Sequence, residues 1–474
     1  MLKSVSSAEL LHEFDTHIEP HLAAIASEGD LQRRVEMISA AQHSLFAPFV
    51  KRVNTSDHFA SAFWRLANHV IPVAKDVSAC LESHSPLLRV VKNKQASRTL
   101  WLVKGPFDLA HMDCVKNFLF GWRQYNATTR VPQDQHYLLF LDSPIPQSLV
   151  GSKYAFSFAT KRSVMLKLYR LRELSNSLSI DSIIWPGVFQ DMSLYMGIRN
   201  APQQIFWSAK HRIQIMPETL DQYFFGGFSK RTIYHQGVPW KYGRFDLTPW
   251  KGMHRLENLE SNSKKNAPDD AVPMLLKEVR KKHQVVFGSV CVEHKYSSPA
   301  FWAAIDQILG DLPQAAYCFS GRSVLPEVKT ILNKLAARDR IYYVGWHDNV
   351  DDALGYFDIY LDAFPFGSSH VLYQCWRREL PTISLRSSEN IRLSIHHSLS
   401  SVPSLVDNHV FSFPALADSV SQYIHLAVAC ATNGNLSVAI ASQQYQIIDS
   451  CMANPAGMYA DFSEHISDGL ALLL

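Results

Sequence analysis

One segment constrains the fold of this chain more than any other. Residues 358–370 (DIYLDAFPFGSSH) combine a short apolar strand, a turn of small residues and the start of a helix. The helix is expected over residues 371–378, and residues 379–385 (ELPTISL) form a second apolar strand entered through Pro381. A strand, a helix and another strand in this order make a βαβ unit, which belongs in a parallel sheet of an α/β protein.

The turn of this unit suits a phosphate group. Gly367 lets a ligand come close to the backbone, and Ser368, Ser369 and His370 add side-chain donors. A helix that starts here also offers unpaired N–H groups and a partial positive charge. The alternative is an ordinary helix cap, in which Ser369 satisfies the first turn.

The same segment resembles the donor-binding motif of the soluble protein glycosyltransferases that include peptide O-GlcNAc transferases and the cytoplasmic glucosyltransferases of bacterial adhesins. That family has an Asp, a Pro-containing step, a small-residue turn, a helix and a Gly-Pro or Leu-Pro strand entry in this order. Asp362 lies 19 positions before Pro381 (381 − 362), which is the family's separation. Val371, Leu372 and Gln374 depart from the family, which has small polar residues and Gly at the first two positions and an Asp at the third.

Composition limits the classes of protein to which the chain can belong. Its 474 residues suggest two or three domains, and 47% hydrophobic with 19% charged residues is typical of a well-packed protein. A net charge of +3 does not indicate a nucleic-acid partner. The seven scattered cysteines without a C-x-x-C pair favour a reducing compartment, and we expect a cytoplasmic protein without a signal peptide or an integral membrane segment.

The periodicity of apolar residues divides the chain into four parts. Residues 1–96 have helical spacing throughout, whereas residues 97–260 alternate apolar strands with helices. After a polar linker at 256–273, residues 274–415 repeat the alternation, and residues 416–474 are expected to form helices that brace the two halves. We predict an α/β protein of GT-B architecture, in which two Rossmann-like domains face one another across a cleft. The expected strands are 100–103, 137–141, 154–158, 183–185, 205–207, 285–290, 315–319, 341–344, 358–361 and 382–385.

Candidate donor-binding residues follow the strands of the second α/β half. The resemblance implies that Asp362 and the turn bind a UDP-sugar, that Lys295 contacts its diphosphate, and that Ser289 also contacts the nucleotide. An ammonium at this point stabilises a departing nucleoside diphosphate, and a solvated loop lysine is the alternative. The resemblance also places Trp346 and His347 at the nucleotide base, although an aromatic residue here can simply pack the sheet edge.

Candidate acceptor-side residues lie in the first α/β half. By resemblance, His111, which follows the first strand, faces the acceptor and serves as its base, with a structural histidine as the alternative. Gln204 ends an Arg-x-Ala-Pro-x-Gln segment that is similar to a family motif, and His211 follows it. The resemblance implies that Gln204 and His211 contact the donor or acceptor sugar.

Motifs for other chemistries are absent from the sequence. It contains no H-E-x-x-H, Asp-x-Asp, Walker or G-x-G-x-x-G pattern, so we expect no metal and no cofactor beyond the UDP-sugar co-substrate. We therefore predict an inverting, metal-independent glycosyltransferase that transfers a hexose, glucose or GlcNAc, to a protein acceptor. A glycan or lipid-linked acceptor, and a non-catalytic GT-B partner subunit, are the alternatives, and the oligomeric state stays open.

Overall fold

The chain folds into two compact units, each with its own sheet. The N-terminal unit contains Ser4–Leu247 and Ala453–Leu474, and the C-terminal unit contains Thr248–Met452. The computed structural model describes residues 11–46, 49, 56–88, 96–104, 113–128, 134–158, 163–186, 193–208, 218–226, 231–235, 238–243, 274–347, 350–365, 367–368, 370–385, 415–451, 457, 459–460, 462–464 and 466. The linker predicted at 256–273 lies outside these residues.

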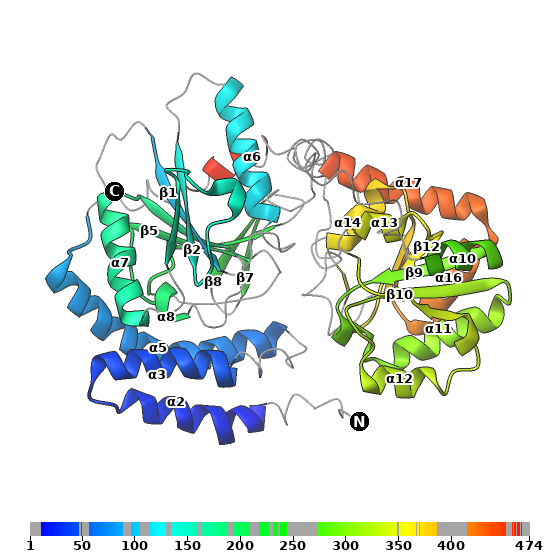
Figure 1. Ribbon diagram of the computed structural model, residues 1–474, viewed down its shortest axis with the longest axis horizontal. Coiled ribbons are helices and arrows are strands. Elements are labelled where there is room, and N and C mark those ends of the chain that lie inside the picture. Colours follow the sequence, from blue (N-terminus) through cyan, green and yellow to red (C-terminus); the bar gives the residue numbers. More distant parts are fainter. Residues whose placement is uncertain are drawn as a thin grey trace. The chain divides into compact units, whose positions relative to one another are not determined.

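Helices dominate the first described part of the chain, as predicted. They are the π-helical turn η1 (Phe14–Ile18), α2 (Glu19–Ala26), α3 (Leu31–Ala41), the π-helical turn η2 (Gln42–Phe46) and α5 (Ser56–His84). α3 begins after Asp30, whose carboxylate accepts a hydrogen bond from the Arg33 N–H as a helix cap. α5 buries a stripe at helical spacing, which includes Leu66, Val70, Val73, Val77 and Leu81. Figure 1 shows α2, α3 and α5 as neighbouring helices of the N-terminal unit.

The sheet of the N-terminal unit has eight strands in the order β3-β2-β1-β4-β5-β6-β8-β7. All neighbouring strands are parallel except the β7–β8 hairpin. The strands are β1 (Arg98–Lys104), β2 (Gln135–Leu141), β3 (Ala155–Phe158), β4 (Ser182–Pro186), β5 (Gln203–Ser208), β6 (Gln222–Gly226), β7 (Arg231–His235) and β8 (Val238–Gly243). The first five were predicted, whereas β6 to β8 were not. Helices α6 (Asp113–Thr128) and α7 (Val164–Ser177) flank the sheet, and the short α8 (Ser193–Met196) precedes β5.

The end of the chain completes the core of the N-terminal unit. Phe462 is fully buried, and its ring stacks on Trp101 at 5.7 Å between centroids and contacts Phe118 at 4.8 Å. The Tyr459 hydroxyl donates a 2.7 Å hydrogen bond to the Asp134 carboxylate just before β2. Trp101 and Phe462 therefore belong to one aromatic cluster, although they are far apart in the sequence.

The sheet of the C-terminal unit has six parallel strands in the order β11-β10-β9-β12-β13-β14. They are β9 (Val285–Val290), β10 (Ala315–Ser320), β11 (Ile341–Tyr343), β12 (Ile359–Leu361), β13 (Thr382–Leu385) and β14 (Leu416–Ala417). The first five match the predicted strands to within one residue at each end. The sixth corrects the expected helical tail, because Leu416–Ala417 pairs with β13 through backbone hydrogen bonds.

Helices cover both faces of this second sheet (Figure 1). They are α10 (Met274–Lys282), α11 (Pro299–Asp311), α12 (Pro326–Leu332), α13 (Val350–Leu354), α14 (His370–Arg377), α16 (Val420–Thr432) and α17 (Gly434–Cys451), with the 3-10 turns η7 (Glu293–Tyr296) and η8 (Arg338–Arg340). α11 packs against α16 on one face, and α14 packs against α17 on the other. No single described helix is long and apolar enough to cross a bilayer, although α16 and α17, bent by 111° at their junction, pass that test as a pair.

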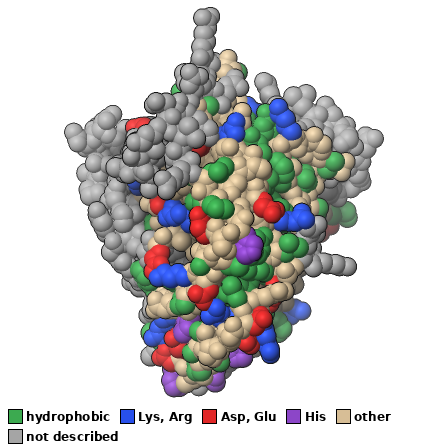
Figure 2. Space-filling model, turned by 90° about the vertical axis from the view of Figure 1, so that its left-hand side faces the viewer, with side chains coloured by type: hydrophobic (Ala, Val, Ile, Leu, Met, Phe, Trp, Pro, Cys, Tyr) green, Lys and Arg blue, Asp and Glu red, His purple; other side chains and the backbone are tan. Residues whose placement is uncertain are grey.

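Charge is mixed on the face of the molecule that Figure 2 presents. Lys and Arg side chains are interspersed there with Asp and Glu side chains, and hydrophobic side chains lie between them. A nucleic-acid-binding surface gathers basic side chains on one face. The described part of this face shows no such concentration.

Candidate active site

The turn after β12 is shaped by the buried carboxyl group of Asp362. Its side chain is 2% exposed, and Oδ1 accepts a 2.7 Å hydrogen bond from the backbone N–H of Ser368. The Ser384 hydroxyl lies 3.3 Å from Oδ2 and joins the turn to β13. Asp362 therefore holds the turn from the inside. This explains why an Asp precedes the small residues, and it gives Asp362 a supporting part rather than an exposed contact surface.

Burial controls the ionisation of this carboxyl group. Loss of hydration raises the pKa of Asp362 to about 7, while the nearby Lys295 ammonium and the hydrogen bonds from Ser368 and Ser384 act in the opposite direction. Asp362 therefore exchanges its proton close to neutral pH.

Lys295 reaches the same turn from a different loop. It lies in η7 after β9, and its Nζ donates a 2.7 Å hydrogen bond to the carbonyl oxygen of Gly367. The structure thus brings together two residues, 72 positions apart, that the sequence analysis assigned to one diphosphate site. The ammonium stands next to the turn that leads into α14, whose N-terminus adds a partial positive charge.

This meeting point lies at a special place in the sheet. β9 and β12 are neighbours, and the chain leaves them toward opposite edges, since β10 and β11 lie on one side and β13 and β14 on the other. Ligands of open α/β sheets bind at the carboxyl ends of the strands at such a switch point. Lys295, Gly367 and Ser368 all follow the carboxyl ends of β9 or β12.

Ser289 does not reach this edge, which corrects the expectation that it contacts the nucleotide. Its side chain is fully buried within β9, where the hydroxyl donates to the Leu361 carbonyl and accepts a 2.7 Å hydrogen bond from the Tyr317 hydroxyl. Ser289 therefore ties three neighbouring strands together.

The loop after β11 forms the outer rim of the same edge. Gly345 has a positive φ of 80°, and its carbonyl accepts hydrogen bonds from the Gly321 N–H at 3.1 Å and the Ser320 hydroxyl at 2.7 Å. Trp346 follows with 45% of its surface exposed, and the Arg322 guanidinium lies 4.9 Å from the centre of its ring. An exposed indole offers a surface for a planar group.

The two residues predicted for base contact therefore differ in accessibility. The His347 side chain is buried, whereas Trp346 is open to solvent. Arg322 was not selected from the sequence. Its contact with Trp346 at the rim is visible only in the structure.

Several of the selected residues lie outside the described part of the chain. They are His111, His211, Ser369 and the side chain of His370, although the backbone of His370 begins α14. The roles expected for these groups stay predictions.

The structure also corrects the prediction that Gln204 contacts a sugar. Its side chain is fully buried at the start of β5, where Oε1 accepts from the Asn200 N–H at 3.2 Å and Nε2 donates to the Thr219 carbonyl at 3.1 Å. A sugar contact would require the amide to leave these backbone partners. The Arg-x-Ala-Pro-x-Gln segment is thus a structural connection between two loops.

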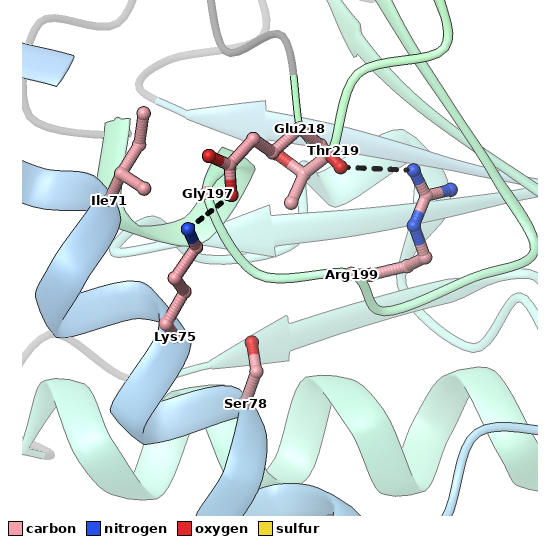
Figure 3. Close-up of a pocket in the computed structure, with 7 residues that line it drawn as sticks. All are labelled: Ile71, Lys75, Ser78, Gly197, Arg199, Glu218 and Thr219. Carbon is pink, nitrogen blue, oxygen red and sulfur yellow. Dashed lines mark hydrogen bonds and ion pairs between the residues drawn. The ribbon is translucent and has the colours of Figure 1, made fainter. Parts of the chain in front are cut away.

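The rest of that segment lines a small cavity in the N-terminal unit. Arg199 makes a two-pronged pair with the Asp221 carboxylate at 2.9 and 3.0 Å, and the Lys75 ammonium lies 3.0 Å from Glu218. The cavity is about 130 Å³ and is lined by Ile71, Lys75, Ser78, Gly197, Arg199, Glu218 and Thr219 (Figure 3). These residues precede β5 and β6 or lie on α5, at the amino ends of the strands. The cavity is therefore at the edge opposite to the one where α/β sheets bind ligands.

In the described part of the chain no group of three or more His, Cys, Asp and Glu side chains is placed to hold a metal ion. Metal independence of the reaction remains a prediction that only an assay decides.

Each of the two sheets contains the strand order of a Rossmann-like domain, β3-β2-β1-β4-β5 in the first and β11-β10-β9-β12-β13 in the second. Two such sheets define a protein of the GT-B fold class. No protein-family model matches the chain, and no curated protein matches it in sequence. Its fold is similar to that of a mutant O-GlcNAc transferase from Thermobaculum terrenum, with a TM-score of 0.56, 13% identity, and coverage of 99% of this chain and 88% of that one. It is also similar to a glycosyltransferase from Rickettsia africae, with a TM-score of 0.50, 9% identity, and coverage of 80% and 99%. At these identities the likeness concerns the fold alone.

Proposed function

We propose that this chain is an inverting glycosyltransferase that transfers a hexose from a UDP-sugar to a protein acceptor without a metal ion. One observation carries the proposal, namely the contact of Lys295 with the Gly367 turn at the switch point of the second sheet. The names of the two structurally similar proteins, an O-GlcNAc transferase and a glycosyltransferase, agree with this class of reaction. A cytoplasmic location belongs to the same proposal.

The proposed donor site uses the C-terminal unit. The diphosphate of the UDP-sugar lies at the turn of Gly367 and Ser368 near the start of α14, and the Lys295 ammonium faces its oxygens. Trp346 offers its exposed ring to the base at the rim. The buried Asp362 carboxyl group stabilises the turn by accepting the hydrogen bond from the Ser368 N–H.

The proposed reaction is a single displacement. The acceptor's nucleophilic atom attacks the anomeric carbon of the sugar, and the bond from that carbon to the diphosphate oxygen breaks as the new bond forms. The electron pair of the broken bond stays on UDP, where Lys295 stabilises the growing negative charge. The acceptor proton passes to a base, for which His111 remains our candidate from the sequence.

Replacement of Lys295 by alanine tests this proposal. The assay measures UDP release from a UDP-hexose in the presence of an acceptor protein. We expect the turnover number of Lys295→Ala to fall about 100- to 1,000-fold, the typical loss for one electrostatic donor. Lys329→Ala, at an exposed position of α12, is the matched control and should retain wild-type turnover. Calorimetric titration with UDP is run beside the kinetics. Unchanged turnover of Lys295→Ala, or a wild-type protein that binds no UDP, would overturn the assignment.

A further inference from the structure

Three charged side chains meet at the carboxyl ends of β1 and β2 in the N-terminal unit. Lys104 is the last residue of β1, Asp142 directly follows β2, and Lys167 lies on α7. Asp142 has a φ of 58°, a left-handed conformation that Asp adopts more readily than most residues. The cluster belongs to the N-terminal unit, whereas the candidate donor site belongs to the C-terminal unit.

The two lysines relate differently to the carboxylate. Lys167 Nζ lies 2.5 Å from Asp142 Oδ1, and the Lys167 side chain is only 5% exposed. Lys104 Nζ lies 3.9 Å from Oδ2, within ion-pair range but beyond hydrogen-bond distance, and its side chain is 21% exposed. Asp142 thus serves first as the partner of the buried Lys167, and the more accessible ammonium is that of Lys104.

The electrostatics of the cluster favour an additional anion. Burial lowers the pKa of Lys104, and Lys167 lowers it further, while Asp142 raises it without offsetting the burial. Tyr195 of α8 also interacts electrostatically with Asp142, and Glu36 of α3 acts on the same tyrosine. An ammonium that has lost hydration gains more from an incoming anion than a fully solvated lysine does.

The position of Lys104 suits a ligand. β1 lies between β2 and β4, at the point where the connections of the first sheet leave in opposite directions. We propose that Lys104, backed by Lys167 and Asp142, is an oxyanion-binding subsite at this edge that takes the carboxylate of an acidic side chain in the protein acceptor. The identity of the ligand rests on the proposed function, in which the N-terminal unit is the acceptor half.

A fluorescent peptide of Glu-Gly-Ser repeats, with a Gln-Gly-Ser peptide as neutral control, tests the subsite by fluorescence anisotropy. Lys104→Met should bind the acidic peptide roughly 10- to 100-fold more weakly than wild type, the range for losing one charge-assisted hydrogen bond. Lys153→Met, at an exposed position before β3, is the matched control and should bind as wild type does. Equal binding of the acidic peptide by wild type and Lys104→Met, or equal binding of both peptides by wild type, would overturn the subsite.

Asp142→Asn provides a test of opposite sign. It removes the charge that competes for Lys104 and keeps an oxygen for Lys167, so the acidic peptide should bind more tightly, and weaker binding would contradict the model of Lys104 recognition. Displacement of the peptide by inorganic phosphate at far lower concentration than by acetate would assign the subsite to a phosphorylated ligand and overturn the carboxylate. UDP titration separates the two proposals. A wild type that binds the acidic peptide through Lys104 but not UDP upholds the subsite and refutes the transferase.

Discussion

Replacing Asp362 by asparagine should change how the stability of the protein depends on pH. The carboxyl group is 2% exposed, and burial raises its pKa to about 7. Asparagine has nearly the same shape, and its amide oxygen can still accept the hydrogen bond from the Ser368 N–H. The variant therefore removes the ionisation of residue 362 while leaving the turn in place.

The magnitude follows from the two pKa values. The ordinary value is 3.8 and the native value about 7, and a difference of about 3 corresponds to roughly 4 kcal/mol. Between these values the native state binds more protons than the unfolded state, so Asp362 lowers stability as pH rises. The penalty is absent below pH 3.8, grows between 3.8 and 7, and is complete above 7. The free energy of unfolding of Asp362→Asn relative to wild type should therefore increase by roughly 4 kcal/mol from pH 4 to pH 8.

Urea unfolding of both proteins at several pH values measures this gain. His136 acts in the opposite sense, because burial lowers its pKa to about 4 and its contribution to stability therefore rises with pH between that value and its ordinary 6.5. This contribution is common to both proteins and cancels in their difference. A difference that stays flat from pH 4 to pH 8 would show that Asp362 does not titrate near 7. A difference that falls with pH would show that Lys295 holds the carboxylate ionised.

Three further predictions concern packing and metal dependence. Gly288→Ala should destabilise the C-terminal unit by about 1–3 kcal/mol, because a Cβ there would lie 2.1 Å from the Phe357 ring, and an unchanged urea midpoint would contradict that packing. Phe462→Ala should cost the N-terminal unit about 3–5 kcal/mol, since the ring fills the space beside Trp101; thermal unfolding measures it, and a loss below 1 kcal/mol would mean that the end of the chain is not part of that core. Sugar transfer in excess EDTA should equal transfer with added magnesium or manganese, and a loss that either metal restores would refute metal independence.

Local patterns in the sequence determined most of the secondary structure and the centre of the candidate donor site. The strands Val285–Val290 and Thr382–Leu385 follow from apolar runs bounded by turn residues, and such signals depend only on neighbouring positions. The turn at Gly367 was selected from its small residues between a strand and a helix, and Lys295 was selected from the family resemblance of the loop after the first strand of the second α/β half. The sequence also predicted the α/β class, because alternating strands and helices leave few other arrangements.

Only the tertiary structure decided which polar side chains face the ligand edge. Ser289 and Gln204 are polar residues beside motifs, yet both are buried, because their orientation depends on strands and loops that pack from elsewhere in the chain. The pKa of Asp362 likewise depends on burial by residues that are distant in the sequence and on the nearby Lys295 ammonium. Lys104 and Asp142 meet because two neighbouring parallel strands end at the same edge of the sheet, and Lys167 reaches them from α7. Burial and charge pairing are sums over such non-local contacts, whereas the sequence pattern records only local ones.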